Sequence, residues 1–192
     1  MKLLTGVIAL LVCTTSAFSQ TKWTIDKSHS DIRFTTTHMT ISEVDGEFKD
    51  FSGTVNSPKP DFSGAEVEFT AKVASINTDS ERRDNHLKGD DFFAAEKYPE
   101  IKFKGKLMKQ GKKYYLTGDF TMRDVTKPIK FAVQFMGQVA GQRGAKAGFK
   151  VTGSINRFDY GLKWSSKMDT GSLVVGETVT ITCNIELNEV KG

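Results

Sequence analysis

Apolar and polar residues alternate along most of the chain after the first twenty positions. In the stretch 179–187, for example, every second side chain is apolar, and the residues between the apolar ones are threonine, asparagine or glutamate. A period of two puts one set of side chains on one face of a β-strand. The pattern therefore predicts an all-β protein of eight or nine strands, over residues 23–26, 31–37, 44–55, 65–73, 101–107, 114–122, 129–135, 147–155 and 179–187.

Most connections between these strands are short and rich in turn-forming residues. KQGKK at 109–113 and DVTKP at 124–128 are typical of hairpin turns, and Pro128 is expected to start the next strand. Two stretches, 56–64 and 137–148, are long enough to be loops. Sequential strands joined in this way are expected to pair antiparallel.

The connection 78–97 is the one segment that favours helix over strand. A capping side chain is available among positions 78–80, and Gly89 or Pro99 could stop the helix. We therefore expect one or two short helices in this connection.

Antiparallel strands with a single apolar face must stack as two sheets or close into a barrel. Eight strands make a barrel that side chains can fill or that can hold one ligand. The apolar positions are rich in phenylalanine, with fourteen in the chain, and rigid rings suit a cavity wall and a dry core equally well. Periodicity alone leaves barrel or sandwich, filled or hollow, open.

The first nineteen residues have the pattern of a secretory signal peptide. Lys2 precedes a short apolar run, and Ala17 and Ser19 stand where a signal peptidase selects small residues. Cleavage before Gln20 predicts an exported protein, periplasmic or extracellular, with a single domain over 20–192 and no integral membrane segment. Cys183 is then the lone cysteine, so internal disulfides are excluded and the core must supply the stability.

Composition argues against several classes of function. The formal charge of +4 comes from lysines that are spread among acids, which is typical of a solvated surface and not of a nucleic-acid-binding protein. No G-x-S-x-G turn or phosphate-binding loop occurs, and one mature cysteine excludes zinc sites of the cysteine type. His29 and His38 lie at an odd separation on a strand, so they would face opposite ways and no shared metal is predicted.

The most charged stretch is DSERRDNHLKGDDFF, residues 79–93, and three readings of it stay open. As a catalytic site, Asp84 would orient His86 as a general base, but a spacing of two points them to different sides of a helix. As a structural element, the charges would pair with each other while the apolar residues plug a barrel. As a recognition element, Arg83 and His86 would meet a polar or anionic head group.

Five motifs in order resemble the YceI-like, polyisoprenoid-binding family. They are WTIDKSHSDIRFTTTHM with VDGEF, RRDNHLKGDDFFAAEKYPEIKF, YLTGDFTMRDVTKPI, NRFDYGLKW and VGETVTI, and together they span about residues 23–187. The resemblance implies a lipocalin-like eight-stranded antiparallel barrel whose apolar cavity holds an isoprenoid or another lipid chain. It also implies a possible homodimer, and no catalytic activity common to the family.

These inferences lead to a prediction of an exported lipid-binding protein, not an enzyme, without a metal or a cofactor. Its ligand would be a long-chain apolar lipid such as an isoprenoid, a quinone or a fatty-acid-like lipid. The alternative is a lipid hydrolase or isomerase that uses Asp84 and His86 at the barrel mouth. Head-group contacts are assigned to Arg83, Asp84 and His86. The inward positions assigned to the cavity wall are Phe34, Val67, Phe69, Ile101, Phe103, Phe120, Phe131, Val133, Phe149 and Val151.

Overall fold

A computed structural model describes residues 20–142 and 144–191, so the predicted signal peptide, 1–19, lies outside the described residues. In these two ranges, eleven strands form one sheet. The strands are β1 (Thr21–Ile25), β2 (Asp31–His38), β3 (Ser42–Phe48), β4 (Phe51–Ser57), β5 (Ala65–Lys72), β6 (Ile76–Asn77), β7 (Glu100–Gln110), β8 (Lys113–Met122), β9 (Val125–Val139), β10 (Lys146–Asn156) and β11 (Val175–Glu189). The helices are α1 (Glu81–Lys88) and the 3-10 turns η1 (Lys27–His29), η2 (Val73–Ser75) and η3 (Arg157–Tyr160).

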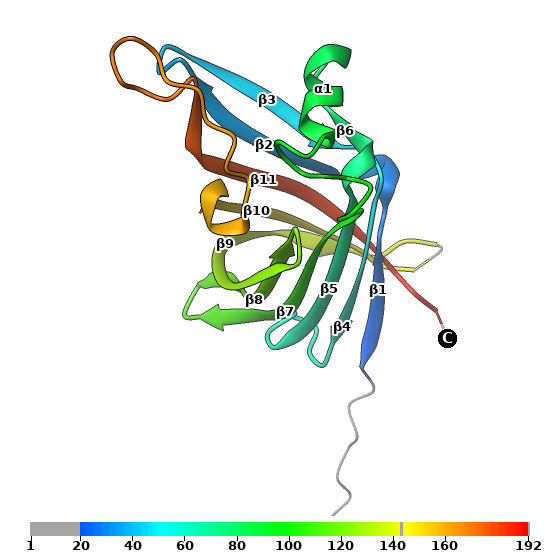
Figure 1. The fold of residues 1–192 in the computed structure, drawn as a ribbon. Helices are drawn as coiled ribbons and strands as arrows, with labels where there is room; N and C mark the ends of the chain where they lie inside the picture. Colours follow the sequence, from blue (N-terminus) through cyan, green and yellow to red (C-terminus); the bar gives the residue numbers. More distant parts are fainter. Residues whose placement is uncertain (1–19, 143, 192) are drawn as a thin grey trace, which may run out of the picture.

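The sheet closes on itself as an eight-stranded antiparallel barrel. The ring runs β1-β4-β5-β7-β8-β9-β10-β11, and β11 returns to β1 with Trp23 opposite Glu189. Closure satisfies the edge hydrogen bonds that an open sheet would expose. The predicted barrel is therefore confirmed, and the two-sheet sandwich is not formed (Figure 1).

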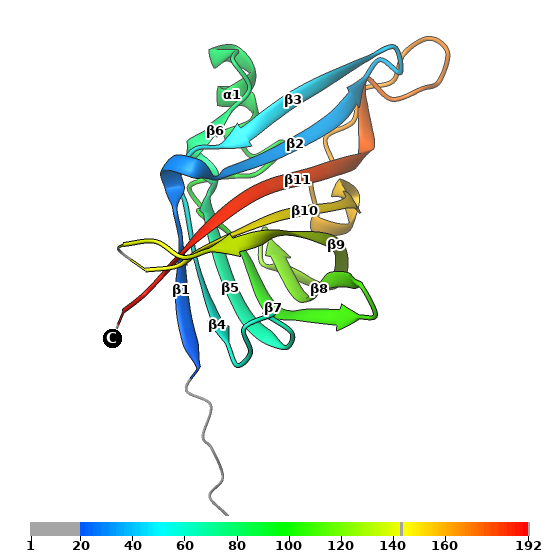
Figure 2. The ribbon, with the colours of Figure 1, turned by 180° about the vertical axis from the view of Figure 1, so that it is seen from behind.

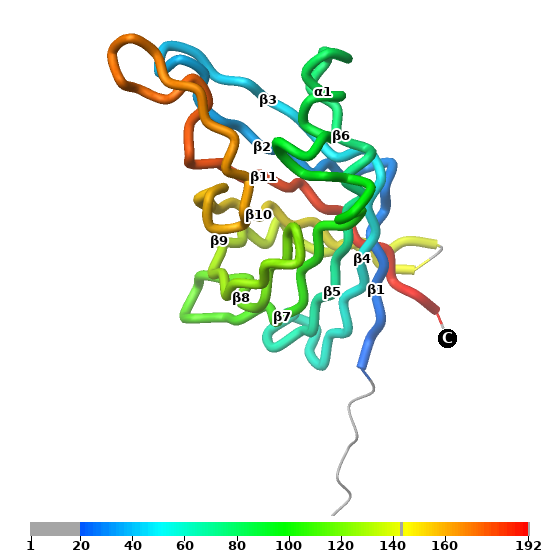
Figure 3. Tube along the Cα trace, viewed as in Figure 1, coloured from blue at the N-terminus to red at the C-terminus, as the bar shows by residue number. Residues whose placement is uncertain are grey.

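One end of the barrel is extended by an arm made of β2, β3 and β6. The long β11 pairs with β1 near its end and with β2 over its first two-thirds, so it runs diagonally from the arm into the barrel (Figure 2). The turn η1 separates β1 from β2, and η2 separates β5 from β6. At the arm, β6 pairs with β3, and α1 stands beside β6 over this end of the barrel (Figure 3).

The opposite end of the barrel is closed by a loop side chain. Phe62 lies in the connection between β4 and β5 and is only 1% exposed. Its ring centroid lies 5.0 Å from that of Trp23 and 5.0 Å from that of Phe149, and Phe135 stacks on Phe149. This aromatic floor makes the barrel a cup, with the arm and α1 at its mouth.

Three local predictions were wrong. The predicted strand 44–55 is two strands, because the chain bends at 49–50. The predicted loop 137–148 is mostly hairpin, since β9 continues to Val139 and β10 begins at Lys146. Pro128 lies inside β9, not at its start, in a stretch that pairs only with β8; a strand with one free side tolerates the missing proline N–H.

The connection 78–97 contains one α-helix, as expected, and it ends at Gly89, the first of the two possible stops. The residues after it form turns that lead into β7. None of the helices within 20–142 and 144–191 combines the length and apolar character needed to cross a bilayer.

Candidate functional site

The barrel encloses an apolar cavity of about 210 Å3. Its wall is built almost entirely from aliphatic and aromatic side chains that point inward from the strands. All of the inward positions predicted from the sequence lie in this wall: Phe34, Val67, Phe69, Ile101, Phe103, Phe120, Phe131, Val133, Phe149 and Val151. That these residues contact a ligand stays a prediction.

The strand register explains why aromatic rings gather on the wall. Phe69 lies opposite Phe103, and Phe103 lies opposite Phe120, so three rings form a row across β5, β7 and β8. Directly opposite side chains on neighbouring strands share a face and pack together. On the other side, the ring of Phe131 covers Gly153, where an added Cβ would lie 2.0 Å from the ring. Glycine is therefore needed there for the ring to lie flat.

Sequence reasoning missed several wall residues because they do not come from alternating strands. Phe62 comes from a loop and Leu162 from a connection at the mouth. Leu87 and Phe92 also reach the wall, and these two were expected from the sequence to plug the barrel. Arg157 also lies in the wall, although its side chain is charged. For Phe62, the flanking prolines and Gly64 signal a tight loop, but no periodicity marks its ring as inward.

Arg83 and Asp84 hold the start of α1 and do not line the cavity. Asp84 is buried, and its Oδ1 accepts hydrogen bonds from the backbone N–H and the hydroxyl of Thr78, at 2.9 and 2.5 Å. Arg83 donates from Nε to the Thr78 hydroxyl (2.8 Å) and from Nη2 to the Thr78 carbonyl (2.6 Å). The two charged side chains thus share one threonine, which fastens the helix to the end of β6.

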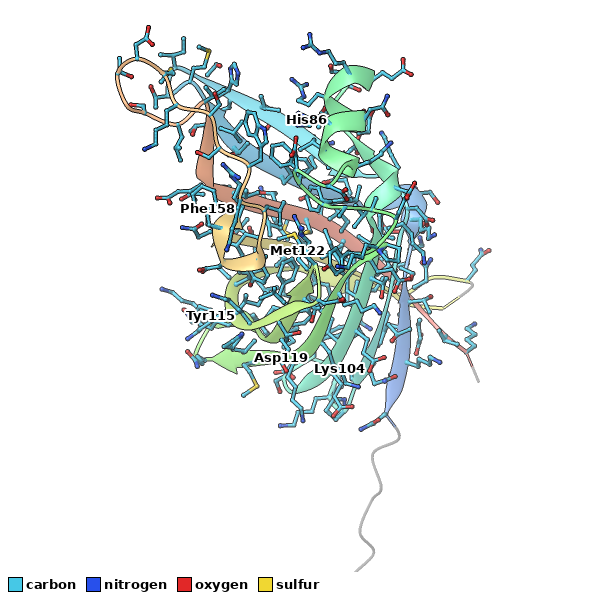
Figure 4. The ribbon with its side chains drawn as sticks, viewed as in Figure 1. His86, Lys104, Tyr115, Asp119, Met122 and Phe158 are labelled. Carbon is cyan, nitrogen blue, oxygen red and sulfur yellow. The ribbon has the colours of Figure 1, made fainter. Side chains whose placement is uncertain are left out.

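His86 lies on the exposed side of α1, with a different set of partners. Figure 4 shows His86 on α1, at the arm end of the barrel. Its Nε2 is 2.8 Å from Oδ2 of Asp91, and its ring meets those of Phe92 and Trp164 edge-on, at centroid distances of 5.0 and 5.4 Å. No hydrogen bond joins His86 to Asp84 in the described residues. The arrangement therefore does not assemble the Asp84–His86 pair that the catalytic alternative requires.

Across the mouth, α1 and its following turn meet the segment that follows η3. Phe92 and Trp164 lie 5.3 Å apart, and both pack with His86. Arg123 donates from Nη1 to the Phe92 carbonyl, which holds the turn against the β8–β9 hairpin. We call His86, Phe92 and Trp164 the aromatic cap. It covers part of the mouth at the end of the cavity opposite Phe62.

Arg157 lies beneath the aromatic cap and is 2% exposed. Its guanidinium donates to the main-chain carbonyls of Leu162 (2.6 Å), Trp164 (2.8 Å), Gly176 (2.9 Å) and Val175 (3.1 Å). Burial lowers the pKa of Arg157, yet an arginine remains protonated at any physiological pH. A full positive charge is therefore held at the inner side of the mouth.

A second cluster of titratable groups lies outside the barrel, near η1. Oxygen and nitrogen atoms of Asp26, His29 and Glu186 lie within 4.8 Å of one another, which is close enough to bind a metal ion. The ammonium of Lys146 already lies between the two carboxylates, 3.3 Å from Asp26 and 2.5 Å from Glu186. This cluster is thus an ion-pair network that ties β1, β10 and β11 together. His38, which the sequence analysis considered with His29 as a metal ligand, lies elsewhere, at the end of β2.

A closed antiparallel barrel with an apolar, capped cavity defines a lipocalin-like class of protein. The chain matches the YceI-like domain family over residues 23–187 and belongs to it. A UPF0312 protein of Staphylococcus aureus (strain N315) is 34% identical over 170 residues, which cover 88% of this chain and 98% of that protein.

Two solved structures are similar. The YceI protein of Campylobacter jejuni is 34% identical with a TM-score of 0.69, over 81% of this chain and 90% of that one. A polyisoprenoid binding domain from Saccharophagus degradans is 16% identical with a TM-score of 0.64, over 88% of this chain and 98% of that one, and supports the fold.

Proposed function

We propose that this protein is an exported, non-enzymatic lipid-binding protein that holds one long apolar chain inside the barrel. The observation that carries the proposal is the cavity, whose wall is almost entirely apolar from Phe62 at the floor to Phe92 at the mouth. Each methylene removed from water contributes about 0.8 kcal/mol, before the entropic costs of association. A wall of this kind can hold an isoprenoid, a quinone tail or a fatty-acid-like chain without specific polar contacts.

The family and one structural relative support this assignment. The Saccharophagus domain with the same fold is described as polyisoprenoid binding. The signal-peptide pattern of residues 1–19 supports delivery to the periplasm or the cell exterior. There, a lipid with a long isoprenoid chain has no stable place in water, and a closed barrel would carry or store it.

The partners of the charged residues on α1 favour binding over catalysis. A lipid hydrolase or isomerase at this mouth would need a base held by an orienting carboxylate. Asp84 is instead hydrogen-bonded to Thr78, and His86 lies beside Asp91 on the exposed side of the helix. We therefore propose a structural role for Asp84 and Arg83, and we place the head group nearer the cap than these two residues.

Native mass spectrometry after detergent-free purification tests the proposal. We expect a co-purified apolar ligand in the wild type, and native mass spectrometry will also show whether the protein is the expected homodimer. Val151→Trp should fill the cavity and remove the ligand, because Val151 lies in its wall. Thr152→Trp is the matched control, since the neighbouring Thr152 is exposed on the outer face.

The result that would overturn the proposal is equally specific. A wild-type protein that carries no ligand and takes up no isoprenol, quinone or fatty acid on titration would exclude a lipid-binding role. Equal ligand occupancy in Val151→Trp and Thr152→Trp would place any bound lipid outside the barrel.

A further inference from the structure

The net charge of the chain conceals an asymmetry between its segments. Residues 101–156 contain twelve lysines and arginines but two acidic residues, a net charge of +10, whereas the rest of the chain carries −6. This segment forms nearly all of β7 together with β8, β9 and β10, which lie side by side in the barrel wall (Figure 2). A sum over the whole sequence averages the two parts, so it missed a basic side of the barrel. Charge asymmetry of this kind is typical of proteins that bind an anionic surface.

Three lysines on this side of the barrel have no acidic partner. The lysines of β7 are largely neutralised by glutamates of β5, as Lys104 is by Glu68. Lys113, Lys130 and Lys150 are exposed, and none of them forms an ion pair with a carboxylate in the part of the chain that the structure describes. Three positive charges therefore face the solvent on β8, β9 and β10.

The strand register brings these three lysines onto one outer surface. Lys150 of β10 lies opposite Gln134 of β9. Lys113 begins β8, one residue before the partner of Val133, so it lies on the other side of the same part of β9. Lys130 shares a face of β9 with Gln134, because the two are separated by an even number of residues. Neighbouring strands are about 4.8 Å apart, so the three lysines form one cluster.

Exposed apolar side chains lie among the lysines. Three of the six large hydrophobic residues that are exposed in the described ranges belong to β7 and β9: Met108 (42% exposed), Met136 (63%) and Val139 (63%). Tyr115 lies opposite Met108, and the Lys130 ammonium is 4.1 Å from the centroid of its ring. We call Met108, Met136 and Val139, together with the three unpaired lysines, the basic face. Its mixture of cations and aliphatic groups is the one found where proteins meet a lipid surface.

We propose that the basic face docks the protein on an anionic lipid bilayer. The lysines would lie among the lipid phosphates, and the methionine and valine side chains would enter the boundary between head groups and acyl chains. Lysines near an anionic leaflet each strengthen binding, and their effects accumulate. The rest of the chain, with its net negative charge, is repelled by the same surface, so docking would occur in one orientation. This inference goes beyond the proposed function and does not require a lipid inside the barrel.

The composition of the basic face favours a bilayer over other partners. A second copy of the chain placed symmetrically on this face would bring the same lysines together, and like charges repel. Single-stranded nucleic acid is bound by basic grooves with exposed aromatic rings on which bases stack. Tyr115, the aromatic residue beside these lysines, is half-buried and has Lys130 over its ring. The aliphatic side chains have a role at a bilayer that neither of these partners would give them.

Vesicle co-sedimentation tests the proposal on the wild type. Vesicles of phosphatidylcholine alone are compared with vesicles that also contain about 30% phosphatidylglycerol. We expect the protein to bind the anionic vesicles roughly 100-fold more tightly, on the order of fivefold for each unpaired lysine. The preference should fall steeply between about 0.05 M and about 0.5 M NaCl, because exposed charges are screened by salt.

A triple variant then assigns the preference to the basic face. Lys113→Gln, Lys130→Gln and Lys150→Gln in one chain should lower the affinity for anionic vesicles by roughly 100-fold. The positions are exposed, so the variant should unfold at the wild-type urea concentration. Met136→Ser with Val139→Ser leaves the charge unchanged and should weaken binding by roughly fivefold or more, because less apolar surface would enter the bilayer.

The matched control removes three positive charges from α1 and from the segment after η3. These residues are exposed and have no ion pair in the described ranges: Arg82→Gln, Lys163→Gln and Lys167→Gln. The control should stay within about threefold of the wild type, although its net charge equals that of the test variant. Equal losses in the two triple variants would overturn the proposal, because binding would then follow net charge and not the basic face.

The other outcomes are equally decisive. Equal binding of the wild type to both kinds of vesicle, or to neither, would overturn docking on an anionic bilayer. An unchanged affinity in the Met136 and Val139 variant would overturn it too, and so would tighter binding to a single-stranded oligonucleotide than to the anionic vesicles. Lipid held in the barrel is measured separately, by native mass spectrometry, so none of these results decides the proposed function.

Discussion

The carboxylate of Asp84 accepts two hydrogen bonds from a single residue, Thr78, through its backbone N–H and its hydroxyl. This contact reaches back from the first turn of α1 to the residue after β6. Ser80 occupies the N-cap position, but its side chain makes no capping hydrogen bond. Asp84 therefore fastens the start of the helix in place of a capping side chain.

We predict that Asp84→Ala destabilises the protein by about 1–3 kcal/mol, because Thr78 is 5% exposed and would lose the acceptor for two donors. Urea unfolding measures the free-energy difference. Arg82→Ala, an exposed position on the same helix, should stay within about 0.5 kcal/mol of the wild type. Equal stability of the two variants would show that the Thr78 contact contributes nothing.

The aromatic floor gives a second prediction. Phe62→Ala should cost about 3–5 kcal/mol in urea unfolding, since the ring is 1% exposed and packs against Trp23 and Phe149. The barrel floor would also open, so the affinity for longer lipid chains should rise relative to the affinity for shorter ones. Met136→Ala, whose side chain is largely exposed, is the control. A loss below about 1 kcal/mol for Phe62→Ala would mean that the loop does not seal the barrel.

Acid stability depends on Asp26. Contact with His29, followed by hydrogen bonds from Ser28 and then smaller contributions that include Lys146, holds the pKa of Asp26 well below its ordinary value. A carboxylate with a lowered pKa in the folded state stabilises the protein above the unfolded pKa, about 4, and this stabilisation is lost as the pH falls toward the folded pKa. The wild type should therefore lose stability progressively below about pH 4.

Asp26→Asn tests this linkage by urea unfolding at several pH values. The variant should be less stable than the wild type at pH 7, and the difference should shrink as the pH falls below about 4. Asp119→Asn changes an exposed carboxylate for which the structure gives no ion pair in the described ranges, and it should follow the wild-type pH profile. If the difference in unfolding free energy between the wild type and Asp26→Asn stayed constant from pH 7 to pH 2, this would contradict a lowered pKa of Asp26 in the folded protein.

Cys183 reports on the interior of the barrel. It lies in the cavity wall, and burial raises the pKa of its thiol to about 12. At pH 8 the thiolate fraction is then roughly 10³-fold smaller than in the unfolded chain, where a free thiol has a pKa of about 8.5. We expect alkylation of Cys183, measured by peptide mass spectrometry, to be much slower in the folded protein than in urea. Rapid alkylation of the folded protein would indicate an open, hydrated cavity.

The sequence predicted the strands better than their ends and connections. Alternation identified the inward faces of β5, β7, β9, β10 and β11, because burial on one side of a sheet imposes a period of two. It could not locate the bend at 49–50 or the position of Pro128 within β9, since both depend on which neighbouring strands are paired at that point. The helix of 81–88 was expected, but its end at Gly89 was one of two possibilities.

The charged stretch 79–93 shows where sequence spacing stops being informative. Spacing indicated correctly that Asp84 and His86 do not share a helix face, but it could not name Thr78 and Asp91 as their partners. Arg157 gave no sequence signal beyond its place in the NRFDY motif. Its burial arises only when η3, the segment to Trp164 and the start of β11 come together in the fold.

The sequence by itself determined the all-β class and the apolar wall, because alternating side chains dictate which face of each strand avoids water. It also carried the family resemblance that the comparisons confirmed. The tertiary structure decided what period and spacing cannot encode. Closure of β1 on β11 chose the barrel over the sandwich, Phe62 from a loop sealed one end, and the buried charge of Arg157 came to lie at the other. These features depend on contacts between residues distant in sequence, which exist only after the chain has folded.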